Sequence, residues 1–127
     1  MSFQESLYQY LSQNIKTADV SADKSPQGDK DKYLLFTKIA GTREYAHDGP
    51  LKTIQIYYQF DCYAKRKSDS LLIKQELQRI LEDFRGDMAG TLVQGAFITS
   101  EFDEYQNDSQ FFREEVEYQI QYYEGVI

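Results

Sequence analysis

The stretch from Leu51 to Ala64 alternates between apolar and polar residues along most of its length. One set of alternate residues is apolar: Ile54, Ile56, Tyr58, Phe60, Cys62 and Ala64. The residues between them are mostly polar: Thr53, Gln55, Tyr57, Gln59, Asp61 and Tyr63. Because successive side chains of a strand point to opposite faces, this period of two predicts a β-strand with one buried face. The other face is then either wet or packed against another subunit.

Three more segments are predicted to be strands: 33–40, 91 to about 102, and 112–122. The last alternates again, with an apolar face of Phe112, Val116, Tyr118, Ile120 and Tyr122. Its polar face consists of Arg113, Glu115, Glu117, Gln119 and Gln121. Glu114 interrupts the apolar face near its start, which predicts a strand end or an edge strand.

The N-terminal residues predict a helix that ends near Ile15 or Lys16. Ser2 and Glu5 have the spacing of a capping box, in which each side chain binds the backbone N–H of the other residue. An apolar residue then recurs at every fourth position: Phe3, Leu7, Leu11 and Ile15. This spacing places the apolar side chains on one helical face.

A second helix is predicted after Ser68 or Ser70, either of which can cap it. Its apolar stripe is formed by Ile73, Leu77, Ile80 and Phe84, and is widened by Leu81. Gly86 follows as the expected left-handed residue at the helix C-terminus. Two polar connectors remain: a long surface loop at 17–32, and the turn-rich segment 41–50.

The predicted order of elements is α-β-β-α-β-β within a single domain, 1–127. No pair of strands is joined as a repeated βαβ unit, so the pattern favours the α+β class. We expect a mainly antiparallel four-stranded sheet with two helices packed on one face.

The charge balance argues against a general nucleic-acid binder. Acidic residues outnumber basic ones by 21 to 14, which gives a formal charge of −7. Proteins that bind DNA non-specifically gain affinity from clustered Lys and Arg, whereas the only basic run here is the short Lys65-Arg66-Lys67. No apolar run approaches the roughly 18 residues that span a bilayer, and the N-terminus does not resemble a signal peptide. We therefore expect synthesis in the cytoplasm and no membrane partner.

The chemistry-bearing residues do not form a recognisable catalytic pattern. The sole histidine, His47, stands beside Asp48 in the 41–50 connector, where a turn residue followed by an Asx-turn Asp is the favoured reading. The single cysteine, Cys62, lies on the apolar side of its strand, which predicts a buried thiol. Because metal-ligand spacings and phosphate-binding loops are also lacking, we expect no enzymatic activity, no metal and no cofactor.

Tyrosine is unusually abundant, with 11 residues, and it suits half-buried strands and protein interfaces. We expect contacts with other proteins from the two connectors and from the polar strand faces. The candidate interface residues are Pro26, Gln27, Arg43, Tyr45, His47, Asp48, Gln55, Tyr57, Gln59, Glu115, Glu117 and Gln119.

Four segments in this order resemble the tail-completion, or tail-terminator, proteins of long-tailed phages. They are the helix SLYQYLSQN with the loop SPQG after it, the run YLLFTKIAGTREYAHDGP, the run IQIYYQFDCYAKRKSDSLLIKQELQRILEDFRG, and the acidic, aromatic EVEYQIQYYE. The resemblance implies a structural virion protein at the head–tail interface.

By the same resemblance, the protein would form a homo-oligomeric ring, commonly a hexamer, at the head-proximal end of the tail tube. The ring would end tube polymerisation and meet both the major tail tube protein and a neck protein of the capsid. DNA would pass through its lumen without specific binding.

Two other readings of the residues remain open. The chain could be a small binding module or regulator that uses its Tyr-rich sheet face for one protein partner. It could also be an enzyme with a carboxylate pair, which a loss of activity on replacing His47 or Asp61 would reveal.

Overall fold

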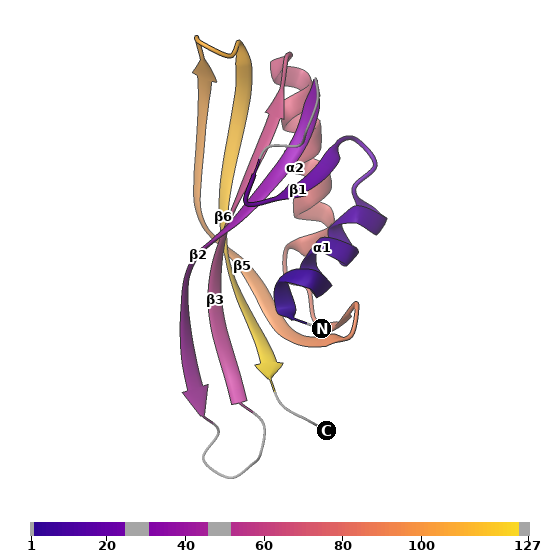
Figure 1. The fold of residues 1–127 in the computed structure, drawn as a ribbon, viewed down its shortest axis with the longest axis vertical. Coiled ribbons are helices and arrows are strands. Elements are labelled where there is room, and N and C mark those ends of the chain that lie inside the picture. Colours follow the sequence, from indigo (N-terminus) through magenta and orange to yellow (C-terminus); the bar gives the residue numbers. More distant parts are fainter. Residues whose placement is uncertain (1, 25–30, 46–51, 125–127) are drawn as a thin grey trace.

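The computed structural model describes residues 2–24, 31–45 and 52–124, and the side chains of 42–45, 52 and 124 are not part of that description. Within these residues there are two helices, α1 (Phe3–Asn14) and α2 (Lys67–Leu81). The strands are β1 (Asp19–Ala22), β2 (Lys32–Tyr45), β3 (Lys52–Ala64), β4 (Gly86–Met88), β5 (Thr91–Gln106) and β6 (Phe111–Glu124). All of them belong to one curled sheet (Figure 1).

The strands lie side by side in the order β1-β2-β3-β6-β5-β4. β1 runs parallel to β2, and the other neighbouring pairs are antiparallel. The predicted four-stranded antiparallel sheet is therefore wrong: the described sheet is six-stranded and mixed, and the element order is α-β-β-β-α-β-β-β. The missed strands, β1 and β4, have only four and three residues, too few for a detectable alternation.

The stretch 17–32, predicted to be one loop, contains β1. Val20 of β1 pairs with Leu34 of β2. This short segment is therefore extended because it pairs with β2, and not because its own residues show a strand pattern. Lys16 and Thr17, just before it, donate their backbone N–H groups to Glu76 of α2. The predicted interface residues Pro26 and Gln27 lie outside the described residues.

Helix α1 follows its sequence signals closely. The Ser2 hydroxyl accepts from the Glu5 N–H at 3.2 Å, and the Glu5 carboxylate accepts from the Ser2 N–H at 3.1 Å, which confirms the capping box. The helix ends at Asn14, with Ile15 as its C-cap. Phe3, Leu7 and Leu11 are buried, as the fourfold spacing predicts.

Helix α2 differs from its prediction at both ends. Its N-cap is Arg66, and the hydroxyl of Ser70 instead donates to the Lys67 carbonyl at 2.8 Å within the first turn. The helix ends at Leu81 rather than before Gly86, because Asp83 takes a left-handed conformation (φ 59°) and turns the chain. The Asp83 N–H then donates to the Ala96 carbonyl of β5, which ties the helix end to the sheet.

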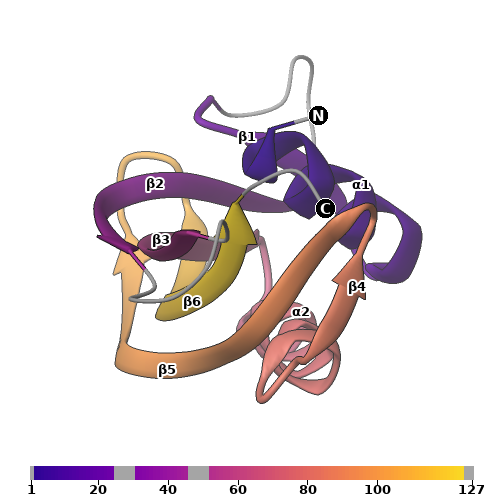
Figure 2. The same ribbon diagram turned by 90° about the horizontal axis from the view of Figure 1, so that it is seen from below.

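Both helices pack on the same face of the sheet, here called the inner face (Figure 2). The apolar sides of β3 and β6 supply most of the core beneath them. The Phe3 ring of α1 stacks on Tyr122 of β6 at 4.4 Å and joins this helix to the sheet, while Phe60 of β3 meets Tyr118 of β6 edge-on at 5.5 Å within the sheet. The opposite, outer face carries the alternate residues of the same strands.

Two strand predictions also need correction. The sequence pattern ends the first long strand at Ala40, but β2 continues to Tyr45 because its residues pair with β3 as far as Lys52. Glu114 does not mark an edge strand, since β6 lies between β3 and β5. Its position, four residues into β6, does agree with a strand end. No helix in the described residues has the length and apolar character needed to cross a bilayer.

Candidate protein interface

The outer face brings together six of the predicted interface residues. The register of β3 and β6 sets Tyr57 opposite Gln119 and Gln59 opposite Glu117, and Glu115 follows in the next row opposite Asp61. At the other end of these paired positions, Gln55 lies opposite Gln121. Each of the six predicted side chains is half-buried in the described chain. They therefore form one continuous polar surface.

A hydrogen bond orders the middle of this surface. The amide Nε2 of Gln119 donates to the hydroxyl oxygen of Tyr57 at 3.1 Å across the β3–β6 ladder. Phe97 of β5 lies in the same row, opposite Gln119, and is 38% exposed. Its ring covers Gly95, where a Cβ atom would come within 2.8 Å of the ring. An exposed aromatic ring thus borders a polar row.

Phe102 is the second exposed aromatic residue of this face, with 53% of its surface accessible. It pairs with Glu115, just as Phe97 pairs with Gln119, so both rings lie on the outer face. Five positions separate them, and a regular strand would place them on opposite faces. The register shift between Ile98 and Ser100 inserts one extra residue into β5, which brings the two rings to the same face.

A charged cluster centred on Arg113 lies on the outer face, at the end of the sheet near the β5–β6 hairpin. Arg113 Nε lies 2.9 Å from Asp61 Oδ1, its Nη1 lies 2.7 Å from Glu104 Oε1, and its Nη2 lies 3.1 Å from Glu115 Oε2. Asp61 also accepts from Gln59 Nε2 at 3.0 Å. One cation thus binds three carboxylates from β3, β5 and β6, and the cluster retains a net negative charge.

The pKa values of the cluster follow from these contacts. Burial disfavours the charge on Arg113, but its hydrogen bonds and ion pairs with Glu104 and Asp61 outweigh burial and raise its pKa. The hydrogen bond from Arg113 lowers the pKa of Glu104. Burial raises the pKa of Glu115, with the Asp61 carboxylate adding to the effect and Arg113 opposing it. The cluster is therefore a structural ion-pair network across three strands.

An aromatic group closes the same end of the face. Tyr33 stacks on Tyr63 at 4.7 Å between ring centres, and both rings meet Phe111 edge-on. The ammonium of Lys65 lies 4.0 Å above the Phe111 ring. Rings of this kind offer apolar area with few rotamers, which is typical of surfaces that contact other proteins.

The other predicted residues are not placed on this surface. His47 and Asp48 lie outside the described residues, and Arg43 and Tyr45 are described only as backbone positions of β2. Sequence reasoning missed Phe97, Phe102 and the Arg113 cluster. The charged residues could have been found from the matching polar faces of 53–63 and 113–121, but the bulge that aligns Phe97 with Phe102 has no sequence signal.

The structure places Cys62 in the core, fully buried, as predicted. Burial raises the pKa of its thiol, and the Asp61 and Glu114 carboxylates raise it further. A thiol in this environment is a poor nucleophile. Among residues 2–24, 31–45 and 52–124, no group of three or more His, Cys, Asp or Glu side chains is arranged to hold a metal ion.

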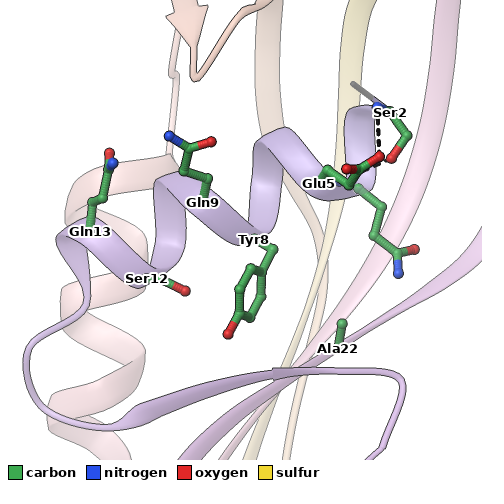
Figure 3. Close-up of a pocket in the computed structure, with 8 residues that line it drawn as sticks. Ser2, Glu5, Tyr8, Gln9, Ser12, Gln13 and Ala22 are labelled. Atoms are coloured by element: carbon green, nitrogen blue, oxygen red, sulfur yellow. Dashed lines mark hydrogen bonds between the residues drawn. The ribbon is translucent and has the colours of Figure 1, made fainter.

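A separate pocket of about 900 Å³ lies along the exposed side of α1 (Figure 3). Tyr8 projects from α1 toward β1, and Glu5 is held by the Ser2 cap. The described lining is Ser2, Gln4, Glu5, Tyr8, Gln9, Ser12, Gln13 and Ala22. Among the described lining residues, the ionisable side chains are those of Glu5 and Tyr8.

Comparison with known proteins identifies the fold. No family model matches the sequence, and no curated protein gives a significant match. Among solved structures, the fold matches a chain of the "Virion of native gene transfer agent (GTA) particle" with a TM-score of 0.74. The two sequences are 10% identical, and the match covers 97% of this chain and 96% of that chain. This likeness shows a shared fold over almost the whole domain.

Proposed function

We propose that this chain is a structural virion protein of a phage-like particle. The observation that carries the proposal is the match in fold, over nearly the full length of both chains, to a component of a gene transfer agent virion. The tail-completion resemblance of the sequence points in the same direction. One line of support is the order of sequence segments, and the other is the backbone geometry.

Within the particle, the proposed position is the head-proximal end of the tail tube. There the protein would form a ring, commonly a hexamer, end tube polymerisation and join the tail to the capsid neck. The outer face suits such a role because it combines half-buried polar side chains with the exposed rings of Phe97 and Phe102. Tyr and Phe rings with a polar surround are typical of the surfaces through which subunits meet.

The acidic balance of the protein, with a formal charge of −7, fits a ring through which DNA moves. On the described outer face, the carboxylates of Asp61, Glu104, Glu115 and Glu117 outnumber the cations Arg113 and Lys65. Carboxylates repel phosphates, and without clustered cations the duplex gains no counterion release on contact. A ring with this charge balance would let DNA pass without holding it. The protein would act without catalysis and without a cofactor.

Deletion of the gene from its native genome tests the proposal. We expect the mutant to release filled or empty heads without tails, and free tubes longer than the normal tail, in negative-stain electron micrographs. Supplying the gene in trans should restore tailed particles. Tails of normal length attached to heads, or a genome that produces no such particles even with the intact gene, would refute the proposed role.

A further inference from the structure

β2 and β5 are paired on the side away from the sheet centre along only part of their length. β1 pairs with Tyr33–Phe36 of β2, and β4 pairs with Thr91–Val93 of β5. In the part of the chain that the structure describes, no further strand pairs with the free side of either β2 or β5. Backbone N–H and C=O groups along such an edge are a template for another strand.

Two hydrogen bonds identify which backbone groups point outward. The Ala96 carbonyl of β5 accepts from Asp83 outside the ladder, at 2.9 Å, so Ala96 points away from β6. Alternation along the antiparallel ladder, with the observed register, then turns Glu101 and Asp103 outward as well. On β2, the Phe36 carbonyl accepts from Asp23, and the same alternation turns Gly41 outward.

The uncovered parts of the two edges lie at opposite ends of the sheet. Tyr33, which β1 covers, is level with Glu104 of β5 through the pairs with Tyr63 and Arg113. In the same way, Val93, which β4 covers, lies level with the last part of β2. Figure 1 shows this diagonal, with the β5–β6 hairpin at the upper end and the ends of β2 and β3 at the lower end.

This arrangement makes the two edges fit a second copy of the same chain. Within one copy, β2 and β5 run in opposite directions. If a second copy lies beside the first with its inner face on the same side, its β2 is therefore antiparallel to β5 of the first copy. If the neighbour is shifted along the strand direction, the uncovered end of its β2 lies beside the uncovered end of β5 in the first copy. β1 of the neighbour and β4 of the first copy then lie beyond the two ends of the contact. Such a stagger is what closing a sheet into a ring of tilted strands requires.

The side chains along the two edges are complementary in charge. The β5 edge carries Glu101 and Asp103 on the inner face, where Lys74 and Lys67 of α2 are their ion-pair partners. On the β2 edge, the exposed Lys38 lies across Gly41, with its Cε 3.4 Å from where a Cβ would be. In the staggered pair, Lys38 of one copy faces the acidic edge of the next copy.

We propose that residues 100–106 of β5 pair, antiparallel and head to tail, with residues 40–45 of β2 in a second copy. These are the regular stretches that follow the bulges at Ile98/Ser100 and Lys38/Ala40. The contact is heterologous, so repeating it generates a closed ring when the rotation between copies closes. The inference rests on the proposed function, for which it supplies the ring contact.

Proline variants test the contact, because proline lacks the N–H that an edge strand donates. Glu101→Pro removes an outward N–H from β5, with Glu101→Ala as its matched control. Gly41→Pro does the same on β2, with Gly41→Ala as control. We expect the wild type and Gly41→Ala to associate as concentration rises. Glu101→Ala keeps the N–H but loses the acidic side chain, so it should associate at a higher concentration than the wild type. Each Pro variant alone should remain monomeric in analytical ultracentrifugation.

Mixing the two Pro variants makes the test specific. Each retains one intact edge, and these two edges are the complementary ones, so the mixture should form 1:1 dimers and nothing larger in native mass spectrometry. A wild type that stays monomeric at every concentration, Pro variants that assemble as the Ala variants do, or a mixture without dimers would each overturn the inference.

Hydrogen exchange of the unsubstituted protein gives a readout that does not depend on how well the Pro variants fold. In the associated state, the amides of Gly41, Glu101 and Asp103 should exchange at least tenfold more slowly than in the monomer. Equal exchange rates in the two states would contradict edge pairing.

Complementation separates this inference from the proposed function. If the deletion mutant lacks tails and a gene carrying Glu101→Pro restores them, the edge contact is wrong while the virion role stands. If the deletion mutant makes normal tails, the virion role is wrong whatever the edges do in solution.

Discussion

Arg113 Nε on β6 lies 2.9 Å from Asp61 Oδ1 on β3, a diagonal ion pair across the ladder of the two central strands. The side chain of Asp61 is 5% exposed and that of Arg113 is 16% exposed. Removing the cation leaves a buried carboxylate without its partner, which is costly because the charge stays desolvated. We expect Arg113→Met to lower the free energy of unfolding by about 3 kcal/mol in urea titrations.

Arg79→Met provides the control for losing an arginine. Its side chain is 69% exposed and lies 3.8 Å from Glu76, so we expect a change below about 0.5 kcal/mol. Equal effects of the two substitutions would show that the Arg113 cluster adds nothing beyond surface electrostatics.

Glu114 is predicted to make stability depend on pH. It is buried on the inner face, and burial raises its pKa, while Lys74 opposes the effect. An acid whose pKa is higher in the folded state destabilises the fold once it is charged, and that loss is recovered as the pH falls through the raised pKa. Glu114→Gln should therefore raise the urea midpoint at pH 7.

The increase in urea midpoint caused by Glu114→Gln should shrink as the pH falls toward 4.5, because the Glu114 carboxyl of the wild type is then increasingly protonated and neutral, like the Gln side chain. Glu117→Gln removes a carboxylate from the outer face of the same strand and is the control for net charge. A gain for Glu114→Gln that is constant between pH 4.5 and 7 would show that burial of the charge is not its cause.

Gly95 and Phe97 should be energetically coupled. A Cβ at position 95 would lie 2.8 Å from the Phe97 ring, so Gly95→Ala must displace that ring from the backbone it covers. We expect Gly95→Ala to cost about 1 kcal/mol in the wild type and markedly less in a Phe97→Ala background. A double-mutant cycle from thermal unfolding measures the coupling, and additive effects would contradict the packing of the ring on Gly95.

Cys62 should be unreactive in the folded protein. The side chain is fully buried, and the raised pKa keeps it as the thiol, whereas the thiolate is the reactive form. With an aromatic disulfide reagent at pH 8, we expect labelling only at the rate of unfolding, and complete labelling at once in concentrated urea. Rapid labelling under native conditions would place the sulfur at the surface.

Phe102 should matter for assembly and little for folding. Because 53% of the residue is exposed, we expect Phe102→Asp to change stability by less than about 0.5 kcal/mol. In the deletion mutant, however, this variant should fail to restore tailed particles. Leu72→Asp on α2, at an equally exposed apolar position, is the control and should restore them. If both variants restore tailed particles equally well, Phe102 on the outer face does not contribute to an assembly contact.

The local elements could be predicted where one short pattern decides the structure. The capping box at Ser2 fixed the start of α1, and the alternation from Ile54 to Ala64 fixed both faces of β3. Prediction failed where the decisive partner is distant in sequence. Residues 19–22 and 86–88 carry no strand pattern, and they are extended because β2 and β5 offer them hydrogen-bonding edges. The end of α2 depends likewise on the contact of Asp83 with Ala96.

The sequence by itself determined that β3 and β6 each have one apolar and one polar side, because alternation is a local property of a strand. It therefore also determined which six described side chains, from Gln55 to Gln119, would share a face. Only the tertiary structure decided that Phe97 and Phe102 lie on that face, since a bulge at Thr99 changes the phase of β5. It alone set the strand order, and with it the two uncovered edges, because order depends on pairing between segments far apart in the chain.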